Sequence, residues 1–247
     1  MEYINKIIQG DCFDVMDKIQ DKSIDLILTD PPFAITRNKW DKEINLGELW
    51  KHYNRIIKDN GAIIIFAQGV FFAKLVLSNE KQYRYDLVWK KGNRVSGFLN
   101  ANKMPLRSHE MICVFYNKLP KYNPQFSIGK PLHGKGKSYM VKEMKNNNYG
   151  KFKPTDDYRK GEVKKYPKSV LDFQKEHPAV FATQKPIELL RYIIKTYSDP
   201  GDIILDSFVG SGSTCIAAKL ENRRYVGIEL NKDFVDLTNK RLIDICK

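Results

Sequence analysis

The sequence is poor in cysteine and histidine, and it has no long apolar run. Its four cysteines stand far apart, without a Cys-x-x-Cys pair, so neither a disulfide framework nor a structural zinc site is expected. The four histidines form no i, i+4 pair, so no metal is expected either. The chain has no apolar stretch of about 18 residues and does not begin like a signal peptide. These absences predict a soluble, cytoplasmic protein with no membrane partner.

Positive charge is what the sequence has in excess. The formal net charge is +13 over 247 residues, which favours a polyanionic partner such as nucleic acid or an anionic membrane surface. Residues 117–168 hold 14 basic and four acidic residues, a net charge of +10, and show little hydrophobic periodicity. Seven tyrosine and phenylalanine residues lie among those lysines, a mixture that suits stacking on bases and contact with phosphates. We expect an insertion that binds nucleic acid; a solvated surface insertion is the alternative.

Outside this segment, apolar runs typical of strands alternate with amphipathic runs typical of helices. The pattern predicts an α/β fold with a mostly parallel twisted sheet and helices on both faces. Strands are expected at 24–28, 62–67, 85–89, 111–116, 202–205 and 225–228, and helices at 46–58, 70–77, 186–197, 214–220 and 232–245. Residues 1–116 and 169–247 are then two halves of one domain, separated by the basic insertion at 117–168.

A glycine-rich turn joins a strand to a helix near the C-terminus. It spans residues 206–214, Asp-Ser-Phe-Val-Gly-Ser-Gly-Ser-Thr, and such a turn lets a ligand approach the backbone closely. Glu229 ends the next strand, where a carboxylate can accept hydrogen bonds from both ribose hydroxyls. A dinucleotide fingerprint would place glycine where Cys215 stands, whereas Asp206 could hold the ammonium group of a methionine-type cofactor directly or through water. The turn therefore favours an adenosine cofactor of the methionine type.

The motif Asp30-Pro31-Pro32-Phe33 follows an apolar strand and is expected at the carboxyl edge of the sheet. The exocyclic amine of adenine is a poor nucleophile, and the Asp30 carboxylate and the Pro31 carbonyl could accept its two hydrogens. Two prolines stiffen the turn, and Phe33 offers a flat face to a base that has left the duplex. For this motif alone, a rigid turn capped by aspartate is the alternative.

Together, these two motifs resemble motifs IV and I of beta-class amino DNA methyltransferases, the N6-adenine and N4-cytosine family. Gly10-Asp11-Cys12, His109-Glu110 and Thr183-Gln184-Lys185-Pro186 add to the resemblance, which is strongest to short DNA methylases of phages and mobile elements. It implies an S-adenosylmethionine-methyltransferase (Rossmann-like) fold with circularly permuted motif order, in a bacterial or phage-encoded protein. The implied reaction is methyl transfer from S-adenosyl-L-methionine to N6 of adenine in DNA, by base flipping and direct in-line transfer, which leaves S-adenosyl-L-homocysteine.

The resemblance also implies roles for particular residues. Asp11 would contact the cofactor's adenine ring, Glu229 its ribose and Thr183 to Lys185 its methionine end, while Trp40 would be a wedge or lid residue beside the flipped base. The implied catalytic residues are Asp30, Pro31, Pro32 and Phe33. The implied cofactor-binding residues are Asp11, Cys12, Asp30, Thr183, Gln184, Lys185, Asp206, Phe208, Gly210, Gly212, Thr214 and Glu229. The implied DNA-binding residues are Lys39, Trp40, Lys135, Lys137, Lys151, Lys153, Arg159 and Lys160.

Several other functions compete with this one. N4-cytosine methylation is the nearest, but that group usually has serine where Asp30 stands. Cytosine C5 methylation needs a nucleophilic cysteine, usually preceded by proline, and no cysteine here follows proline. From other classes, a non-catalytic DNA-binding module and an NAD-dependent oxidoreductase stay open. The expected partner is double-stranded DNA, and a homodimer and a cognate restriction endonuclease are further candidates.

Overall fold

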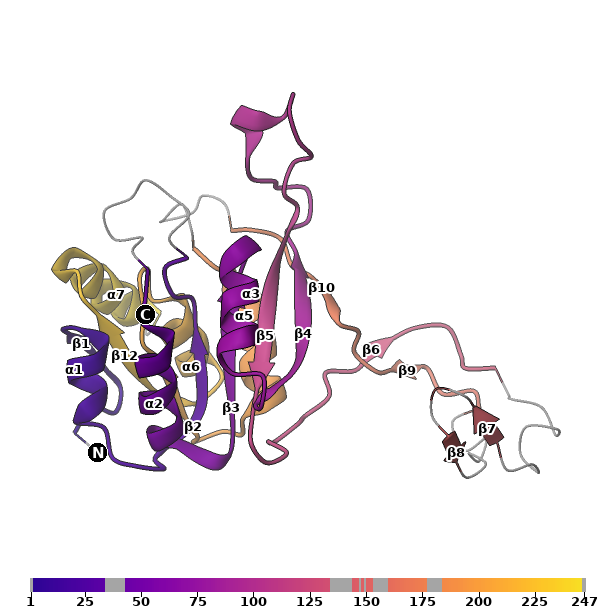
Figure 1. Cartoon of the computed structure of the whole chain (residues 1–247), viewed down its shortest axis with the longest axis horizontal. Helices are drawn as coiled ribbons and strands as arrows, with labels where there is room; N and C mark the ends of the chain where they lie inside the picture. The colour runs from indigo at the N-terminus through magenta and orange to yellow at the C-terminus, as the bar shows by residue number, and fades with distance from the viewer. Residues whose placement is uncertain are drawn as a thin grey trace. The chain divides into compact units, whose positions relative to one another are not determined.

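One sheet of eight strands organises the part of the chain that the computed structural model describes, residues 2–33, 43–133, 144–146, 148, 150–152, 160–176 and 184–245. The strand order is β1-β12-β11-β2-β3-β5-β4-β10 (Figure 1). These strands are β1 (Lys6–Gln9), β2 (Ile24–Thr29), β3 (Ile57–Ala67), β4 (Tyr83–Lys90), β5 (His109–Phe115), β10 (Val170–Asp172), β11 (Ile203–Asp206) and β12 (Arg224–Glu229). Neighbouring strands are parallel except where β5 pairs with β3 and β4. The expected mostly parallel sheet is confirmed.

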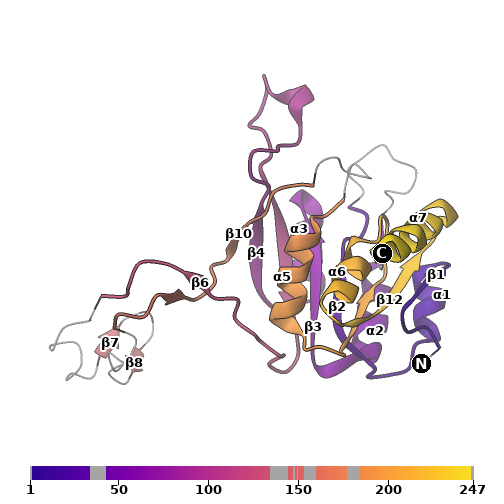
Figure 2. The same cartoon turned by 180° about the vertical axis from the view of Figure 1, so that it is seen from behind.

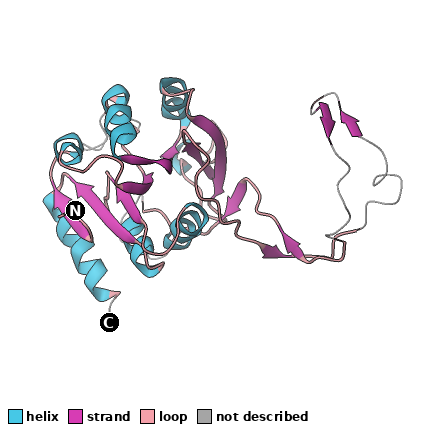
Figure 3. Ribbon diagram, turned by 90° about the horizontal axis from the view of Figure 1, so that it is seen from below, coloured by secondary structure: helices cyan, strands magenta, loops and turns pink. Residues whose placement is uncertain are grey.

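Helices cover both faces of this sheet. The helices are α1 (Cys12–Asp17), α2 (Leu46–Ile56) and α3 (Gly69–Ser78) on one face, and α5 (Ile187–Tyr197), α6 (Ser213–Leu220) and α7 (Lys232–Asp244) on the other (Figures 2 and 3). Side chains alternate between the faces along β3: Ile63 and Ile65 pack with the first group, and Ile64 and Phe66 with the second. Within the described ranges, every helix is too short or too polar to cross a bilayer.

Two short elements before β2 were not predicted from the sequence. β1 has four residues, of which both end residues are exposed, and α1 has only six, so neither leaves a clear hydrophobic period. Asp11 caps α1 by accepting a hydrogen bond from the Phe13 backbone N–H at 2.9 Å. α2 ends at Ile56 rather than at residue 58, because Ile57 is already extended and pairs with Ile24.

The chain divides into two compact units, one of Met1–Asn123 with Lys168–Lys247 and one of Pro124–Pro167. The larger unit holds the sheet of eight strands and its helices. In the smaller unit, β6 (Ser127–Ile128) pairs with β9 (Lys164–Lys165), and β7 (Met144–Asn146) pairs with β8 (Gly150–Phe152). The rings of Phe126 and Tyr166 lie 4.9 Å apart, but both residues are largely exposed. Strands this short explain why the segment shows no clear period.

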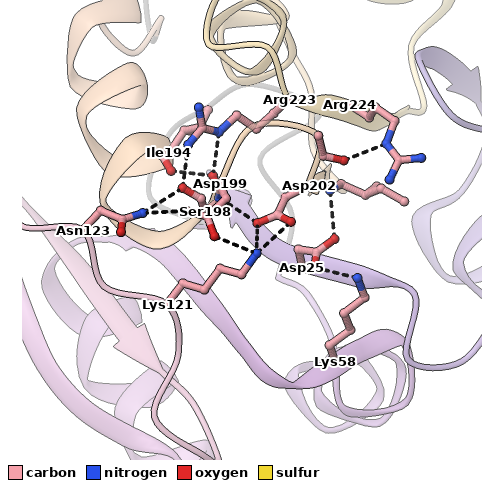
Figure 4. Close-up of polar contacts among 12 residues, drawn as sticks. Asp25, Lys58, Lys121, Asn123, Ile194, Ser198, Asp199, Asp202, Arg223 and Arg224 are labelled. Atoms are coloured by element: carbon pink, nitrogen blue, oxygen red, sulfur yellow. Dashed lines mark hydrogen bonds and ion pairs between the residues drawn. The ribbon is translucent and has the colours of Figure 1, made fainter.

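Polar contacts fix the chain of the larger unit just before the smaller unit begins (Figure 4). The Lys121 ammonium lies 2.7 Å from Asp202 and 3.1 Å from Asp199, in the turn that leads into β11. Asn123 donates its side-chain N–H to the Ser198 carbonyl at 3.1 Å. These contacts lie at the edge of the sheet where β11 begins, opposite the edge where it ends. Residues 117–123, the first part of the basic segment, are therefore anchored in the larger unit.

Two glycines, Gly212 and Gly201, follow or precede strand β11 in a backbone conformation that favours glycine, and at one of them, Gly212, a side chain would also clash with a neighbour. Both have a positive φ, +83° and +87°, but a Cβ on Gly212 would lie 2.4 Å from Thr238 Cγ2, whereas one on Gly201 meets no atom within 4 Å. Gly201→Ala is expected to cost about 1 kcal/mol of unfolding free energy through backbone strain alone. Gly212→Ala adds overpacking and is expected to cost about 3 kcal/mol. Urea denaturation measures both, and equal losses would contradict the clash with α7.

Candidate active site

Four acidic residues follow four neighbouring strands at one edge of the sheet. β1, β12, β11 and β2 are adjacent and parallel, so their carboxyl ends lie at the same edge. Asp11 comes shortly after β1, Glu229 ends β12, Asp206 ends β11 and Asp30 directly follows β2. In open α/β sheets this edge is where ligands bind. The fold thus brings together carboxylates from both ends of the chain.

A direct hydrogen bond joins the strand end of the proline motif to the glycine-rich turn. The Thr29 hydroxyl donates to Asp206 Oδ1 at 2.7 Å, and the Phe208 backbone N–H donates to the same oxygen at 3.1 Å. Thr29 and Asp206 are both buried. Burial raises the pKa of Asp206 to about 6, although these hydrogen bonds act to lower it. Two loops that are distant in the sequence therefore meet around the buried Asp206 carboxyl group.

Glu229 holds the glycine-rich turn in shape. Its Oε2 accepts the Gly210 backbone N–H at 2.8 Å, and its Oε1 accepts the Asn231 backbone N–H at 2.8 Å. Gly210 adopts a φ of +52°, and a Cβ there would point into open space. Each carboxylate oxygen has two lone pairs, so both oxygens of Glu229 keep acceptor capacity for a ligand.

A buried chain of alternating charges lies beside Asp30. The Lys185 ammonium, just before α5, contacts Asp30 Oδ2 and lies 3.3 Å from Glu110 Oε2. Glu110, in β5, places its Oε1 2.5 Å from the ammonium of Lys91, the residue after β4. The Lys91 and Lys185 side chains are only 2% and 9% exposed. Because β5 runs antiparallel to its neighbours, it begins at the edge where β2 and β4 end.

The ionisation of these groups is coupled. Burial raises the pKa of Asp30, and the Lys185 charge opposes that effect without overcoming it. Burial alone would lower the pKa of Lys185, but Asp30 and Glu110 outweigh it and raise that pKa. Burial would likewise raise the pKa of Glu110, but Lys185 and Lys91 together lower it. Lys185 is therefore held as an ammonium between two carboxylates.

One oxygen of Asp30 has no partner among the described residues. The Asp30 side chain is 28% exposed overall, but its Oδ1 atom is buried and receives no hydrogen bond from any of them. A buried acceptor without a donor costs free energy, so native structures rarely keep one without a reason. At the edge of an open α/β sheet, this oxygen is suited to receive a hydrogen bond from a bound ligand.

The rest of the proline motif is well supported. Pro31 is buried, and Pro32 and Phe33 are half-buried. The Phe33 ring stacks on Phe71 of α3, with 5.1 Å between centroids and 24° between planes. Phe33 is thus braced by α3, which limits how far its ring can turn.

The other site residues expected from the sequence divide into described and undescribed positions. Cys12 is the first residue of α1, and burial raises its pKa to about 12, so its thiol stays neutral. Gln184 is buried and donates to Glu176, Thr214 is buried in α6, and Phe208 is half-buried in the turn. Lys151 lies in β8, and Lys160 is exposed in a turn. The residues outside the described ranges are Lys39, Trp40, Lys135, Lys137, Lys153, Arg159 and Thr183.

Sequence reasoning gave no role to two members of the charge chain, Glu110 and Lys91. Each lies within two residues of one end of a predicted strand, where a polar residue is ordinary, and the His109-Glu110 motif added to the family resemblance without implying a role for Glu110. The two residues considered together could have indicated an ion pair. An acidic residue at the start of one strand and a basic residue at the end of another would pair if the two strands were antiparallel neighbours. In the described ranges, no group of three or more His, Cys, Asp or Glu side chains could hold a metal ion.

Comparison with known proteins agrees with this geometry. The family of N6/N4 DNA methylases matches residues 24–240. The type II methyltransferase M2.MboI of Moraxella bovis is 29% identical, over 97% of this chain and 88% of its own length. The DNA adenine methyltransferase YhdJ of Escherichia coli K12 is also 29% identical, over 96% of this chain and 82% of its own length.

Solved structures share the fold. The M1.HpyAVI–SAM complex has a TM-score of 0.66 at 24% identity and covers 96% of this chain and 99% of its own. The cytosine-N4-specific PvuII DNA methyltransferase also has a TM-score of 0.66, at 16% identity, over 97% of this chain and 90% of its own. The matched family model, which spans both the proline motif and the glycine-rich turn, shows that the chain belongs to the N6/N4 DNA methylase family.

Proposed function

We propose that this chain is a site-specific DNA methyltransferase that modifies N6 of adenine. The observation that carries the proposal is the buried Asp30 Oδ1, an acceptor with no donor among the described residues. The N6 amine has two N–H donors, and Asp30 with Pro31 offers two acceptors. A carboxylate at this position, where the N4-cytosine group usually has serine, favours adenine. One relative is itself named a DNA adenine methyltransferase, while one protein of the same fold is named cytosine-N4-specific, so the fold accommodates either base.

The methyl donor is S-adenosyl-L-methionine, and the product is S-adenosyl-L-homocysteine. The chemistry of the donor set fits this group, because carboxylates suit its ammonium, its ribose hydroxyls and its adenine amine. Asp206, Glu229 and Asp11 offer these carboxylates at the ends of three adjacent strands, and the open side of Gly210 leaves the turn accessible. One structure of the same fold is described as a SAM complex. When bound, the donor supplies an electrophilic methyl group on a positively charged sulfur.

The chain's own residues prepare the amine for transfer. Asp30 Oδ1 and the Pro31 carbonyl accept the two N–H groups, which concentrates the lone pair on nitrogen and offsets the positive charge that develops there. Phe33, braced by Phe71, stacks on the flipped base. Asp30 is also placed to take the proton that the methylated nitrogen releases, since burial raises its pKa. Such a positioned carboxylate contributes about 10²- to 10⁴-fold in rate.

The basic segment 117–168 is the part that we propose meets DNA, through Lys135, Lys137, Lys151, Lys153, Arg159 and Lys160, with Lys39 and Trp40 beside the flipped base. Each phosphate contact steepens the fall of affinity with salt by about 0.9 in a double-logarithmic plot. We expect Lys151→Gln with Lys153→Gln to lower that slope by about 2. The matched pair Lys22→Gln and Lys58→Gln, at the edge where β2 begins, is expected to leave it unchanged. Fluorescence anisotropy at several salt concentrations measures both slopes, and equal slopes would contradict the role of the segment.

Two further partners belong to the proposal. The segment between β4 and β5 projects beyond the end of the sheet (Figure 1) and exposes Phe98 by 74%, Leu99 by 81% and Met104 by 57%. An apolar surface of this kind is typical of an interface, and it supports a homodimer. The second partner is a cognate restriction endonuclease, which the type II methyltransferases among the relatives support.

Analysis of the methylated base tests the proposed function. Purified protein is incubated with DNA and S-adenosylmethionine that carries a labelled methyl group, and the DNA is digested to nucleosides for mass spectrometry. Labelled N6-methyldeoxyadenosine is expected, and sequencing of the same DNA then gives the recognised site. Labelled N4-methyldeoxycytidine would refute adenine as the target. Absence of label from every nucleoside would refute DNA methyltransferase activity.

A further inference from the structure

Glu110 occupies an unusual place beside the proposed active site. Its side chain is only 12% exposed, and its two oxygens face two different lysines, Lys91 at 2.5 Å and Lys185 at 3.3 Å. Lys185 in turn contacts Asp30 Oδ2. Asp30 and Glu110 each contact Lys185 rather than one another. Glu110 can therefore influence Asp30 through Lys185 or through the electrostatic effect of the Glu110 charge.

Geometry explains why a second carboxylate matters here. An ammonium group has three donors on a flexible stem, and with Asp30 as its sole partner it could bond to either carboxylate oxygen. The Lys185 ammonium lies between Asp30 Oδ2 and Glu110 Oε2, which is 3.3 Å away and pairs with it by charge, without a hydrogen bond. Lys91 fixes Glu110 in return, and its own ammonium is 5.5 Å from the Trp89 ring and 3.4 Å from the Ser96 hydroxyl. Lys91, Glu110, Lys185 and Asp30 are therefore joined by ion pairs whose lysines are buried, unlike the partners of a surface ion pair.

We propose that Glu110 is a positioning residue for methyl transfer: by sharing Lys185 with Asp30, it keeps the ammonium on Asp30 Oδ2 and leaves Oδ1 open to the target amine. This inference rests on the proposed function, since it assigns Asp30 Oδ1 to the substrate. In this proposal Lys185 holds the catalytic carboxylate of Asp30, in addition to its predicted role at the methionine end of the cofactor.

The charges around Asp30 give the proposal an electrostatic signature. The groups that face it are Lys185, Glu110 and Lys91, with Asp206 across from it on β11, and Lys175 lies near Lys91. Glu110 acts to raise the pKa of Asp30, whereas both lysines act to lower it. Without the Glu110 charge, the lysines would be less compensated and the pKa of Asp30 would fall. The acid limb of the rate profile, which follows protonation of Asp30, would then move to lower pH.

The test is Glu110→Gln in the full chain, assayed by single-turnover methyl transfer across a range of pH. The transfer rate at its optimum is expected to fall about 10- to 100-fold, because Asp30 becomes a weaker acceptor and Lys185 can cover Oδ1. The acid limb is expected to move to lower pH, and affinities for DNA and cofactor are expected to change less than about threefold. Glu110→Asp, which restores the charge, is expected to recover part of the rate and the original acid limb.

A matched control variant exists on the opposite edge of the sheet. Glu221 follows α6, is also 12% exposed and lies 2.6 Å from Arg191 Nε. Glu221→Gln removes the same charge from an equally exposed carboxylate far from Asp30, so it is expected to keep the wild-type rate and acid limb. Circular dichroism confirms that each variant is folded.

Two results would overturn the inference while the proposed function stands. One is an active Glu110→Gln variant with the wild-type rate and acid limb. The other is a loss confined to cofactor affinity, which would make Lys185 a cofactor ligand alone. If the wild-type protein transfers no methyl group, the proposed function fails. The effect of Glu110 on Asp30 can still be tested, because NMR titration of the carboxyl groups measures the pKa of Asp30 without an activity assay. A lower pKa of Asp30 in Glu110→Gln supports that link, and an unchanged pKa overturns it.

Discussion

Replacing Asp30 with alanine is expected to abolish methyl transfer, with a loss of at least about 10³-fold in rate, while S-adenosylmethionine still binds. The variant removes the only acceptor that we assign to one N–H of the target amine. Lys185 keeps Glu110 as a partner at 3.3 Å, so no charge is left entirely unpaired in the interior. Single-turnover assays with labelled donor measure transfer, and isothermal titration calorimetry measures cofactor binding.

Asp30→Asn removes the negative charge of the side chain and keeps its shape. The amide keeps one acceptor oxygen but loses the negative charge that offsets the developing positive charge on nitrogen, so we expect a loss of about 10²-fold or more. The matched control is Asp202→Asn, which removes the charge of another lysine-paired aspartate, 2.7 Å from Lys121 and 13% exposed, at the opposite edge. That variant is expected to transfer methyl groups at the wild-type rate. Substantial turnover by Asp30→Ala would count against the assignment of the catalytic carboxylate.

Asp206→Asn is expected to weaken S-adenosylmethionine binding at least about tenfold at neutral pH, as the loss of one charge-assisted hydrogen bond to the ammonium implies. The wild-type protein should show a related pH effect, since burial raises the pKa of Asp206 to about 6. Below that pH the carboxyl is neutral and cofactor affinity should fall, whereas the affinity of Asp206→Asn should stay flat over the same range. Calorimetry across pH measures both profiles, and parallel profiles would exclude Asp206 as the ammonium partner.

The same substitution should act on stability in the opposite direction. A carboxyl whose folded pKa is raised from 3.8 to about 6 stabilises the fold when protonated, and this contribution is lost as pH rises through the folded value. At neutral pH the buried charge is a cost, and Asn removes it while its oxygen still accepts from Thr29 and Phe208. We therefore expect Asp206→Asn to raise the free energy of unfolding of the cofactor-free protein by on the order of 1 kcal/mol. Lower stability together with weaker cofactor binding would point to general damage at the site.

The sequence was sufficient to predict the elements that end at the site. Asp30, Asp206 and Glu229 each close an apolar strand, and a parallel sheet brings the ends of such strands to one edge. The Thr29–Asp206 hydrogen bond follows from β2 and β11 being neighbours, which the motif order alone does not reveal.

The buried charge chain could not be predicted in the same way. An apolar run such as the one in β5 indicates a strand but not its direction, and Glu110 reaches Lys91 and Lys185 only because β5 is antiparallel and lies between β3 and β4. β1 and α1 are not predicted for a different reason: they are short, and β1 is held by pairing with β12 and α1 by core packing of Val15 and Met16, neither of which leaves a local period.

A crystal structure of the protein with a DNA duplex and a non-reactive analogue of S-adenosylmethionine tests the central claim most directly. The account predicts a flipped adenine whose N6 lies about 2.6–3.2 Å from Asp30 Oδ1, with the analogue against Asp206 and Glu229 at the same edge of the sheet. An extruded base whose amine is far from Asp30, or an analogue bound away from these two carboxylates, would contradict it.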